Sequence, residues 1–162
     1  MKTWISSGQQ LRGVGSGNRD LDCQGGPAIM FPDLDAVTSS YHRCRDSAEF
    51  VDTFYAHFLA KSQEVADKFR STHFTRQKLM LRESLLAMLL FNLGSPDARK
   101  ELERLGQRHS RRGVDIAPHL YDLWLDALCE AVERHDPQFT ADLGKQWRAA
   151  MRPGIDLIVS YY

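Results

Sequence analysis

The sequence predicts an all-α domain over residues 33–162, on two observations. From Asp33 onward, apolar residues recur three and four positions apart, the spacing that places them on one face of an α-helix. No part of this region shows the alternation of apolar and polar residues that marks a half-buried strand. A chain of 162 residues can bury one sizeable core but is too short for two ordinary enzyme domains. We therefore expect a single helical domain.

Residues 1–32 differ in composition from the rest of the chain. They contain the glycine-rich stretches "RGVGSGNRD" and "CQGGPAIMFP", which have neither helical nor strand periodicity. Such a segment buries too little apolar surface to offset the entropy lost on ordering. We expect a flexible, disordered N-terminal extension, for which a linker, a partner-docking strip and a poorly used start of the coding frame are all open readings.

The first three helices follow from their apolar spacing. One is expected after "FPD", through "LDAVTSSYHRC", and a second begins near Ser47, whose hydroxyl can cap it. A short helix at "EVADKF" then leads to a polar corner at "RSTH". The second helix carries an apolar stripe that must face the core, made of Phe50, Val51, Phe54, Tyr55, Phe58 and Leu59.

A long helix is expected to begin at Thr75 and to run through "RQKLMLRESLLAMLLF". Its second half is apolar on nearly every side, which predicts deep burial. The next helix begins with a capping Ser95 and a proline at the first helical position, and it is expected to end at Gly113.

Two more helices complete the expected domain. Asp115 is predicted to cap a helix over "IAPHLYDLWLDALCEAVERH". The last helix carries "FTADLGKQWRAAM", and Pro153 beside Gly154 is expected to bend or break it before "IDLIVSYY".

Charge and cysteine content exclude several classes of protein. Lys plus Arg and Asp plus Glu number 21 each, so no net field draws the chain to nucleic acid or to an anionic membrane. Cys23, Cys44 and Cys129 are an odd number without CxxC spacing, which argues against a disulfide scaffold and a zinc site. The apolar run from Leu85 to Leu93 is about half of a membrane span. We expect a soluble cytoplasmic protein.

Four positions stand at spacings that agree with one another. His109, in "QRHS", lies near a helix end and is followed by a turn and "IAP". Tyr55, in "FYAHF", precedes Phe69 of "ADKF" by 14 residues (69 minus 55). Gln77 precedes His109 by 32 residues (109 minus 77). His109 taken alone could simply end its helix, where the helix dipole favours a cation.

These positions and the order of the helices resemble bacterial single-domain globins and the globin domain of flavohaemoglobins, over roughly Leu34 to Tyr162. The resemblance implies a globin fold, with about seven helices around a pocket for haem b. It implies His109 as the proximal iron ligand and Phe69 as the phenylalanine packed against the haem. Tyr55 and Gln77 correspond to the distal tyrosine and glutamine of that group.

The distal register has two readings. The interval from Phe69 to Gln77 is 8 residues (77 minus 69), about two shorter than in similar globins. With Gln77 as the distal glutamine, Leu81 is the apolar residue over the iron. If "LRESL" instead matches the family's "QREAL", Leu81 takes the distal polar position and Leu85 lies over the iron. We prefer Gln77, because a polar group from the long helix then joins Tyr55.

The proximal side also has a counterpart in the family. Tyr121 corresponds to a tyrosine that, together with a glutamate, tunes the proximal histidine of flavohaemoglobins. The position of that glutamate falls near Tyr162, so the carboxylate is expected to be missing. A backbone carbonyl near Leu105 is the expected acceptor for the second ring nitrogen of the histidine. Two readings are open for the basic cluster, contact with the haem propionates and a solvated helix end; its members are Arg104, Arg108, Arg111 and Arg112.

The resemblance implies a haem protein that binds O2, NO and CO at a five-coordinate iron, for sensing, scavenging or storage. An NO dioxygenase is an alternative, and it needs a separate reductase, since the chain has no room for flavin and nicotinamide domains. A haem-free globin-like signalling module is the third reading. The oligomeric state is open: similar globins commonly pair through the last two helices, and here Trp124, Trp147, Tyr161 and Tyr162 offer aromatic surface for a homodimer.

Overall fold

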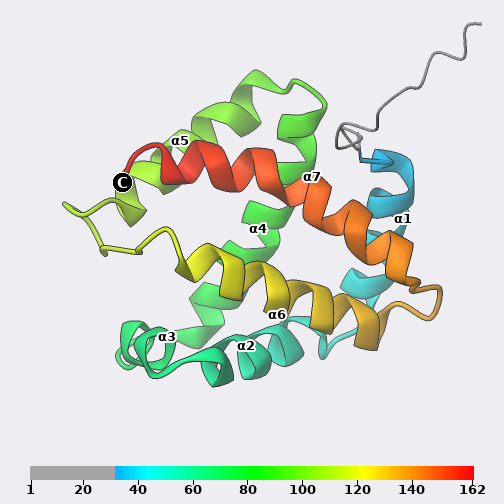
Figure 1. The fold of residues 1–162 in the computed structure, drawn as a ribbon, viewed down its shortest axis with the longest axis horizontal. Coiled ribbons are helices and arrows are strands. Elements are labelled where there is room, and N and C mark those ends of the chain that lie inside the picture. The colour runs from blue at the N-terminus through cyan, green and yellow to red at the C-terminus, as the bar shows by residue number, and fades with distance from the viewer. Residues whose placement is uncertain (1–31) are drawn as a thin grey trace, which may run out of the picture.

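The computed structural model describes residues 32–162, so the predicted disorder of the extension lies outside the described residues. Helices are the only regular secondary structure in the described part, which confirms the all-α prediction (Figure 1). None of these helices is long and apolar enough to cross a membrane. They are α1 (Leu34–Asp46), α2 (Phe50–Lys61), α3 (Gln63–Lys68), α4 (Phe74–Asn92), α5 (Pro96–His109), α6 (Leu120–His135) and α7 (Ala141–Val159).

Side-chain caps begin four of the helices. Each capping oxygen accepts a hydrogen bond from the main-chain N–H three residues later, which satisfies one of the N–H groups that have no partner within the helix. Ser95 accepts from Ala98 at 3.3 Å and is followed by Pro96 at the first helical position, as the sequence predicts. The other three caps are Asp33 for α1, Ser62 for α3 and Thr140 for α7.

Two predicted caps are wrong. Ser47 ends α1 instead of starting α2, because its N–H bonds to the Cys44 carbonyl and its hydroxyl lies 2.8 Å from Nδ1 of His135. Asp115 has a left-handed backbone with φ of 54°, and α6 begins only at Leu120. Both residues have the right chemistry for a cap, but tertiary partners use them elsewhere.

The predicted end of α5 is also wrong by several residues. The helix ends at His109 instead of Gly113. Beyond it the chain folds back, so that the N–H of Val114 donates to the Arg108 carbonyl and the N–H of Ile116 donates to the His109 carbonyl, both at 2.9 Å. The loop therefore satisfies carbonyls that continued helix would have satisfied.

Helix α7 continues through Pro153, so the break predicted at this proline is not found. Proline cannot donate a main-chain hydrogen bond and crowds the preceding turn. The carbonyl that loses its intrahelical donor is that of Ala149, and beside it the Asn92 side chain of α4 ties α7 down by donating from Nδ2 to the Ala150 carbonyl at 2.7 Å. The helices also approach closely there, because a Cβ atom on Gly154 would lie 2.7 Å from Cγ of Met88. Packing on α4 thus keeps α7 in one piece.

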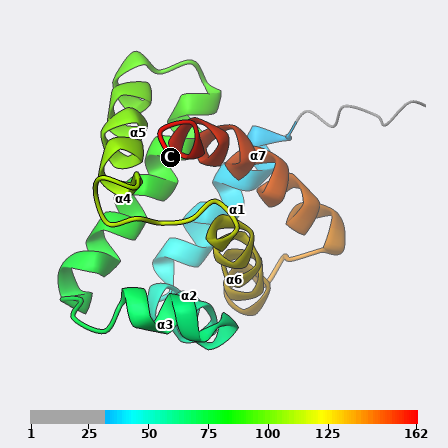
Figure 2. The same cartoon turned by 60° about the vertical axis from the view of Figure 1, so that its left-hand side comes forward.

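Helix α4 runs through the centre of the domain. It packs against α5 and α7 on one side and against α2 on the other, while α2 lies along α6 and α1 packs on α6 and α7. Figure 2 shows α5 and α7 on one side of this arrangement and α2, α3 and α6 on the other. This division leaves room for a cavity between the two groups.

Only one face of α4 enters the core. Leu85 is fully buried, and Met88 and Leu89 are nearly so. Leu86 and Leu93, by contrast, are 47% and 68% exposed. The prediction that the second half of this helix is buried on nearly every side is therefore wrong, since the apolar residues continue onto a face that no described helix covers.

Neighbouring leucines of α4 provide a matched test of this orientation. We expect Leu85→Ala to lower the free energy of unfolding by about 2–5 kcal/mol, because it leaves a cavity in the core. Leu86→Ala removes the same atoms from an exposed position and should change it by less than about 0.5 kcal/mol. Urea unfolding of both variants measures the difference, and equal losses would contradict the orientation of α4.

A buried polar network joins α1 to the end of α6 and to α7. The Asp136 carboxylate, whose side chain is fully buried, accepts from Nε of Arg43 at 2.6 Å and from the Ser40 hydroxyl at 2.5 Å. Nε1 of Trp147 donates to the Ser40 oxygen at 2.9 Å. Burial by itself raises the pKa of Asp136, but the hydrogen bonds from Arg43 and Ser40 outweigh it and hold the pKa below its usual range.

The lowered pKa of Asp136 gives the stability a defined pH dependence. The contribution of this carboxylate is present above about pH 4, the pKa of an unfolded aspartate, and is lost as the pH falls through the lower folded pKa. Asp136→Asn should cost about 3 kcal/mol at pH 7 and progressively less below about pH 4. Urea unfolding at several pH values tests this, with Asp142→Asn, at an exposed pair with Lys145, as the control. A loss that does not depend on pH would refute the assignment.

Candidate functional site

A cavity of about 720 Å³ lies between α4, α5 and the end of α7 on one side and α2, α3 and α6 on the other. Most of the residues that line it are apolar, and a few polar groups converge on it. Its volume falls within the range of about 300–1,000 Å³ that small-molecule and cofactor sites occupy. A second hollow, between α1 and the start of α7, is smaller, at about 430 Å³.

Six of the seven predicted site residues line this cavity. They come from different helices: Tyr55 from α2, Gln77 and Leu81 from α4, His109 from α5 and Tyr121 from α6, with Phe69 at the end of α3. The exception is Leu85, which lies among the residues of the core and does not line the cavity. The geometry therefore favours the register in which Gln77 and Leu81 face the pocket.

His109 is the last residue of α5 and is mostly buried. Its Nδ1 lies 2.8 Å from the Tyr121 hydroxyl. This hydroxyl takes the place expected for a carbonyl near Leu105. Among the described residues, Nε2 of His109 has no hydrogen-bond partner.

Burial, aided by the nearby Arg108 guanidinium, lowers the pKa of His109 to about 4. The imidazole is therefore neutral at neutral pH. Within the described part of the chain, no carboxylate bonds to this imidazole. Tyr162, near the position of the glutamate of similar globins, donates its hydroxyl to Asp115 at 3.0 Å. His109 thus presents at the cavity wall a ring nitrogen, Nε2, that bonds to no described residue.

Tyr55 stands within a cluster of aromatic rings. Its ring contacts Phe54, Phe69 and Phe74 edge-on, at centroid distances of 4.9, 5.8 and 5.6 Å. The hydroxyl donates to the main-chain oxygen of Gln77 at 3.1 Å. Burial raises the pKa of Tyr55, so the hydroxyl keeps its proton.

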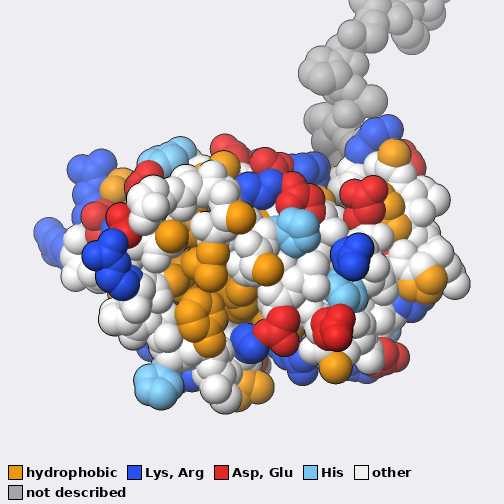
Figure 3. All heavy atoms as spheres, turned by 90° about the horizontal axis from the view of Figure 1, so that it is seen from below, with side chains coloured by type: hydrophobic (Ala, Val, Ile, Leu, Met, Phe, Trp, Pro, Cys, Tyr) orange, Lys and Arg blue, Asp and Glu red, His pale blue; other side chains and the backbone are white. Residues whose placement is uncertain are grey.

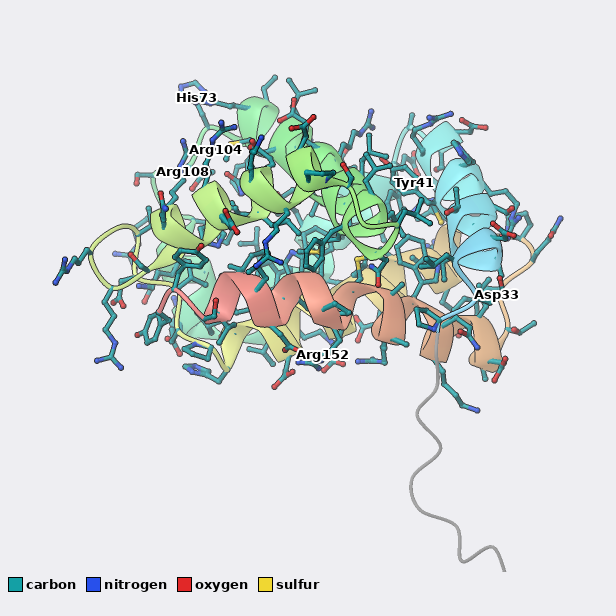
Figure 4. The ribbon with its side chains drawn as sticks, turned by 90° about the horizontal axis from the view of Figure 1, so that it is seen from above. Asp33, Tyr41, His73, Arg104, Arg108 and Arg152 are labelled. Carbon is teal, nitrogen blue, oxygen red and sulfur yellow. The ribbon has the colours of Figure 1, made fainter. Side chains whose placement is uncertain are left out.

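Basic side chains line one edge of the cavity. Figure 4 shows His73, Arg104 and Arg108 at the same side of the molecule, and all three line the cavity. Arg104 pairs with Glu101 at 3.0 Å, whereas Arg108 and Arg76 form no ion pair with any described residue. The remaining arginines of the predicted cluster, at positions 111 and 112, do not line the cavity.

The loop after α5 is anchored on two sides. Nζ of Lys68, in α3, donates to the main-chain oxygen of Asp115 at 2.5 Å. The Arg111 guanidinium lies over the Tyr162 ring, 4.7 Å from its centroid. These contacts hold the segment that follows His109 against both α3 and the last residue of the chain.

Trp124 was missed as a site residue. It was expected on a surface for dimer formation, but it lines the cavity and packs against Phe54, with centroids 5.9 Å apart. Its position three residues after Tyr121 places both side chains on one face of α6, so the helical spacing could have revealed it. Trp147 is fully buried and donates to Ser40, which removes it from the predicted dimer surface.

His119 is exposed and pairs with Glu64 at 2.9 Å. No group of three or more His, Cys, Asp or Glu side chains that could hold a metal ion occurs in residues 32–162. The two described cysteines, Cys44 and Cys129, are buried and unpaired, as expected. Apolar side chains also gather on the outer face seen from below, where charged side chains surround them (Figure 3).

The comparisons with known proteins agree with this geometry. The globin family model matches residues 52–155. A crystal structure from Pseudomonas aeruginosa PAO1, of a protein described as structurally highly homologous to a human hemoglobin, is 45% identical to this chain. The match covers 80% of this chain and 97% of that one, with a TM-score of 0.76. No curated protein matches the chain.

The approach of α5 to α7 beside His109 provides a test of the site. A Cβ atom on Gly106 would lie 2.7 Å from Cδ2 of Tyr161 and 3.1 Å from the Ile158 carbonyl oxygen. Alanine stabilises a helix interior by about 1 kcal/mol relative to glycine. We nevertheless expect Gly106→Ala to destabilise the protein by about 1–3 kcal/mol, because the helices must separate.

Urea unfolding measures this effect. Adding Tyr161→Ser removes one of the two clashes and should restore part of the loss, which makes it the matched control. If Gly106→Ala is more stable than the wild type, the close packing of α5 on α7 is not present in solution.

Proposed function

The chain belongs to the globin family, and we propose that it binds haem b in the cavity and, through the haem iron, the diatomic gases O2, NO and CO. The globin fold expected from the sequence is confirmed. The observation that carries the proposal is the position of His109: a neutral imidazole, with one ring nitrogen bonded and the other free, at the wall of a large apolar cavity.

The residues present fit a haem group in three respects. The cavity has the size and the mainly apolar lining of a cofactor site. Phe69 offers an aromatic ring for contact with a flat macrocycle. Arg76 and Arg108 are cations at the rim without an acidic partner in the described residues, and haem carries two carboxylates that such cations would hold.

In this proposal His109 is the protein ligand of the iron through Nε2. Nδ1 then carries the ring proton and donates it to the Tyr121 hydroxyl, which fixes both the tautomer and the orientation of the ring. Haem iron held by one histidine supplies an open coordination position at which O2, CO or NO binds. The low pKa of His109 means that protons do not compete for the ligating nitrogen at neutral pH.

The chain's own polar groups bear on what the site is used for. Tyr55 from α2 and Gln77 from the start of α4 bring uncharged polar groups to the wall of the cavity. A hydrogen bond from such a group to a partly charged acceptor in a site with little water is worth about 1.5–3 kcal/mol. That energy slows the escape of a gas ligand, so sensing, scavenging or storage suits the site better than rapid delivery. NO dioxygenase turnover would need electrons from a separate reductase.

Absorption spectra test the proposal. Wild-type protein mixed with haem should show a sharp Soret band that shifts when the reduced protein is exposed to CO. His109→Ala should lose this spectrum or show that of weakly held haem, whereas His119→Ala, at the exposed histidine, should leave it unchanged. A wild-type protein that stays colourless with haem in excess refutes haem binding and points to a haem-free signalling module. A normal spectrum in His109→Ala refutes the assigned ligand.

A further inference from the structure

The Tyr55 hydroxyl already donates its proton in a hydrogen bond within the protein. A phenol has a single proton to donate, and here it goes to the main-chain oxygen of Gln77 at 3.1 Å. That oxygen also accepts the main-chain N–H four residues later in α4, but a carbonyl has two lone pairs and can take both bonds. The contact therefore joins α2 to the first turns of α4 without disturbing the helix.

The surroundings of the Tyr55 ring leave little freedom to redirect the hydroxyl. The residue is 4% exposed, and edge-on contacts with Phe54 and Phe74 hold the ring from its own helix and from α4. Phe69 closes a third side, at 5.8 Å between centroids. Turning the hydroxyl into the cavity would break its hydrogen bond, and the neighbouring rings offer no acceptor in exchange.

The side chain of Gln77 is in the opposite situation. It lines the cavity and is half-buried, and its amide makes no hydrogen bond with any described residue. A glutamine amide carries two N–H donors and turns about flexible torsions. The uncharged side chain with donors to spare beside Tyr55 is therefore the amide of Gln77, whose main-chain oxygen accepts the Tyr55 hydroxyl.

We propose that Tyr55 is a positioning residue that fixes the start of α4, and that the Gln77 amide, not the Tyr55 hydroxyl, donates the hydrogen bond to a diatomic ligand in the cavity. The inference rests on the proposed binding of haem and changes the division of roles that the family resemblance implies. In that resemblance the tyrosine is the principal donor and the glutamine adds a second bond.

The chain contains a control for the structural half of this inference. The Tyr41 hydroxyl donates to the main-chain oxygen of Arg82, also in α4, at 3.4 Å. Tyr41 is 5% exposed, so its burial matches that of Tyr55, but it does not line the cavity. Tyr41→Phe therefore removes a hydroxyl-to-carbonyl bond to the same helix without touching the site.

The experiment compares Tyr55→Phe, Gln77→Leu and Tyr41→Phe by two measurements. The first is urea unfolding of the full chain without haem. Tyr55→Phe should raise the unfolding equilibrium constant by about 2- to 10-fold, because it removes a buried hydrogen bond, and Gln77→Leu should leave it unchanged or lower it. If Tyr55→Phe is as stable as the wild type, the positioning role is overturned, whether or not the protein binds haem.

The second measurement uses the haem-loaded proteins, with the O2 dissociation rate and the C–O stretching band of the CO complex as readouts. Gln77→Leu should speed O2 dissociation by about tenfold or more and raise the C–O frequency, since a donor is lost. Tyr55→Phe should change the rate by less than about threefold and leave the band in place, as should Tyr41→Phe. The frequency is a readout that a loss of stability alone does not move.

The outcomes distinguish the inference about Gln77 and Tyr55 from the proposed binding of haem. A large change in Tyr55→Phe with a small one in Gln77→Leu overturns the inference and restores the tyrosine as the donor, while haem binding stands. Large changes in both variants overturn it as well, since Tyr55 then acts on the ligand. A wild-type protein that does not take up haem overturns the proposed function, and the role of Gln77 with it.

Discussion

The constraint on which this fold depends is that its helices must surround a space of about 720 Å³ instead of closing on it. Core residues elsewhere pack to the density of an organic crystal, so an apolar space of this size is unstable unless neighbouring helices are held apart. Here α5 packs on α4 and α7, and α2 packs on α6, so that α4 is the helix that spans both groups. The position of α4 therefore sets the width of the site.

Several side chains from other elements fix α4 through its main-chain carbonyls. Tyr55 bonds to the carbonyl of Gln77 and Tyr41 to that of Arg82, and Asn92 of α4 reaches out to α7. Such bonds use second lone pairs and so add to the helix without competing with it. They are also directional, whereas apolar packing alone would let α4 slide or rotate. The polar groups near the cavity thus have a structural part to play before any ligand is considered.

The sequence predicted some features of the site well and others poorly, for identifiable physical reasons. The resemblance to globins singled out His109, Phe69 and Tyr55 by their spacing along the chain, and the structure brings the three residues to one cavity. The ends of helices were less predictable. Ser47 and Asp115 have the chemistry of caps, but His135 and Lys68, which come from distant segments, bond to them instead. The predicted burial was wrong at Leu86 for a similar reason, since periodicity shows which residues are apolar but not which face of the helix has a neighbour.

The proximal side shows how a missing charge changes the properties of a histidine. Where a carboxylate bonds to the ring N–H, its charge makes the imidazole more basic and a stronger donor to a metal. In this chain the partner of His109 is the neutral Tyr121 hydroxyl, and the nearest charge that acts on the ring is the positive one of Arg108. Burial is the main cause of the low pKa of His109, and the Arg108 charge adds to it. A hydrogen bond thus fixes the orientation of the ring without the electron density that a carboxylate adds, and under the proposed haem binding this would favour reversible binding of a gas over cleavage of its bond.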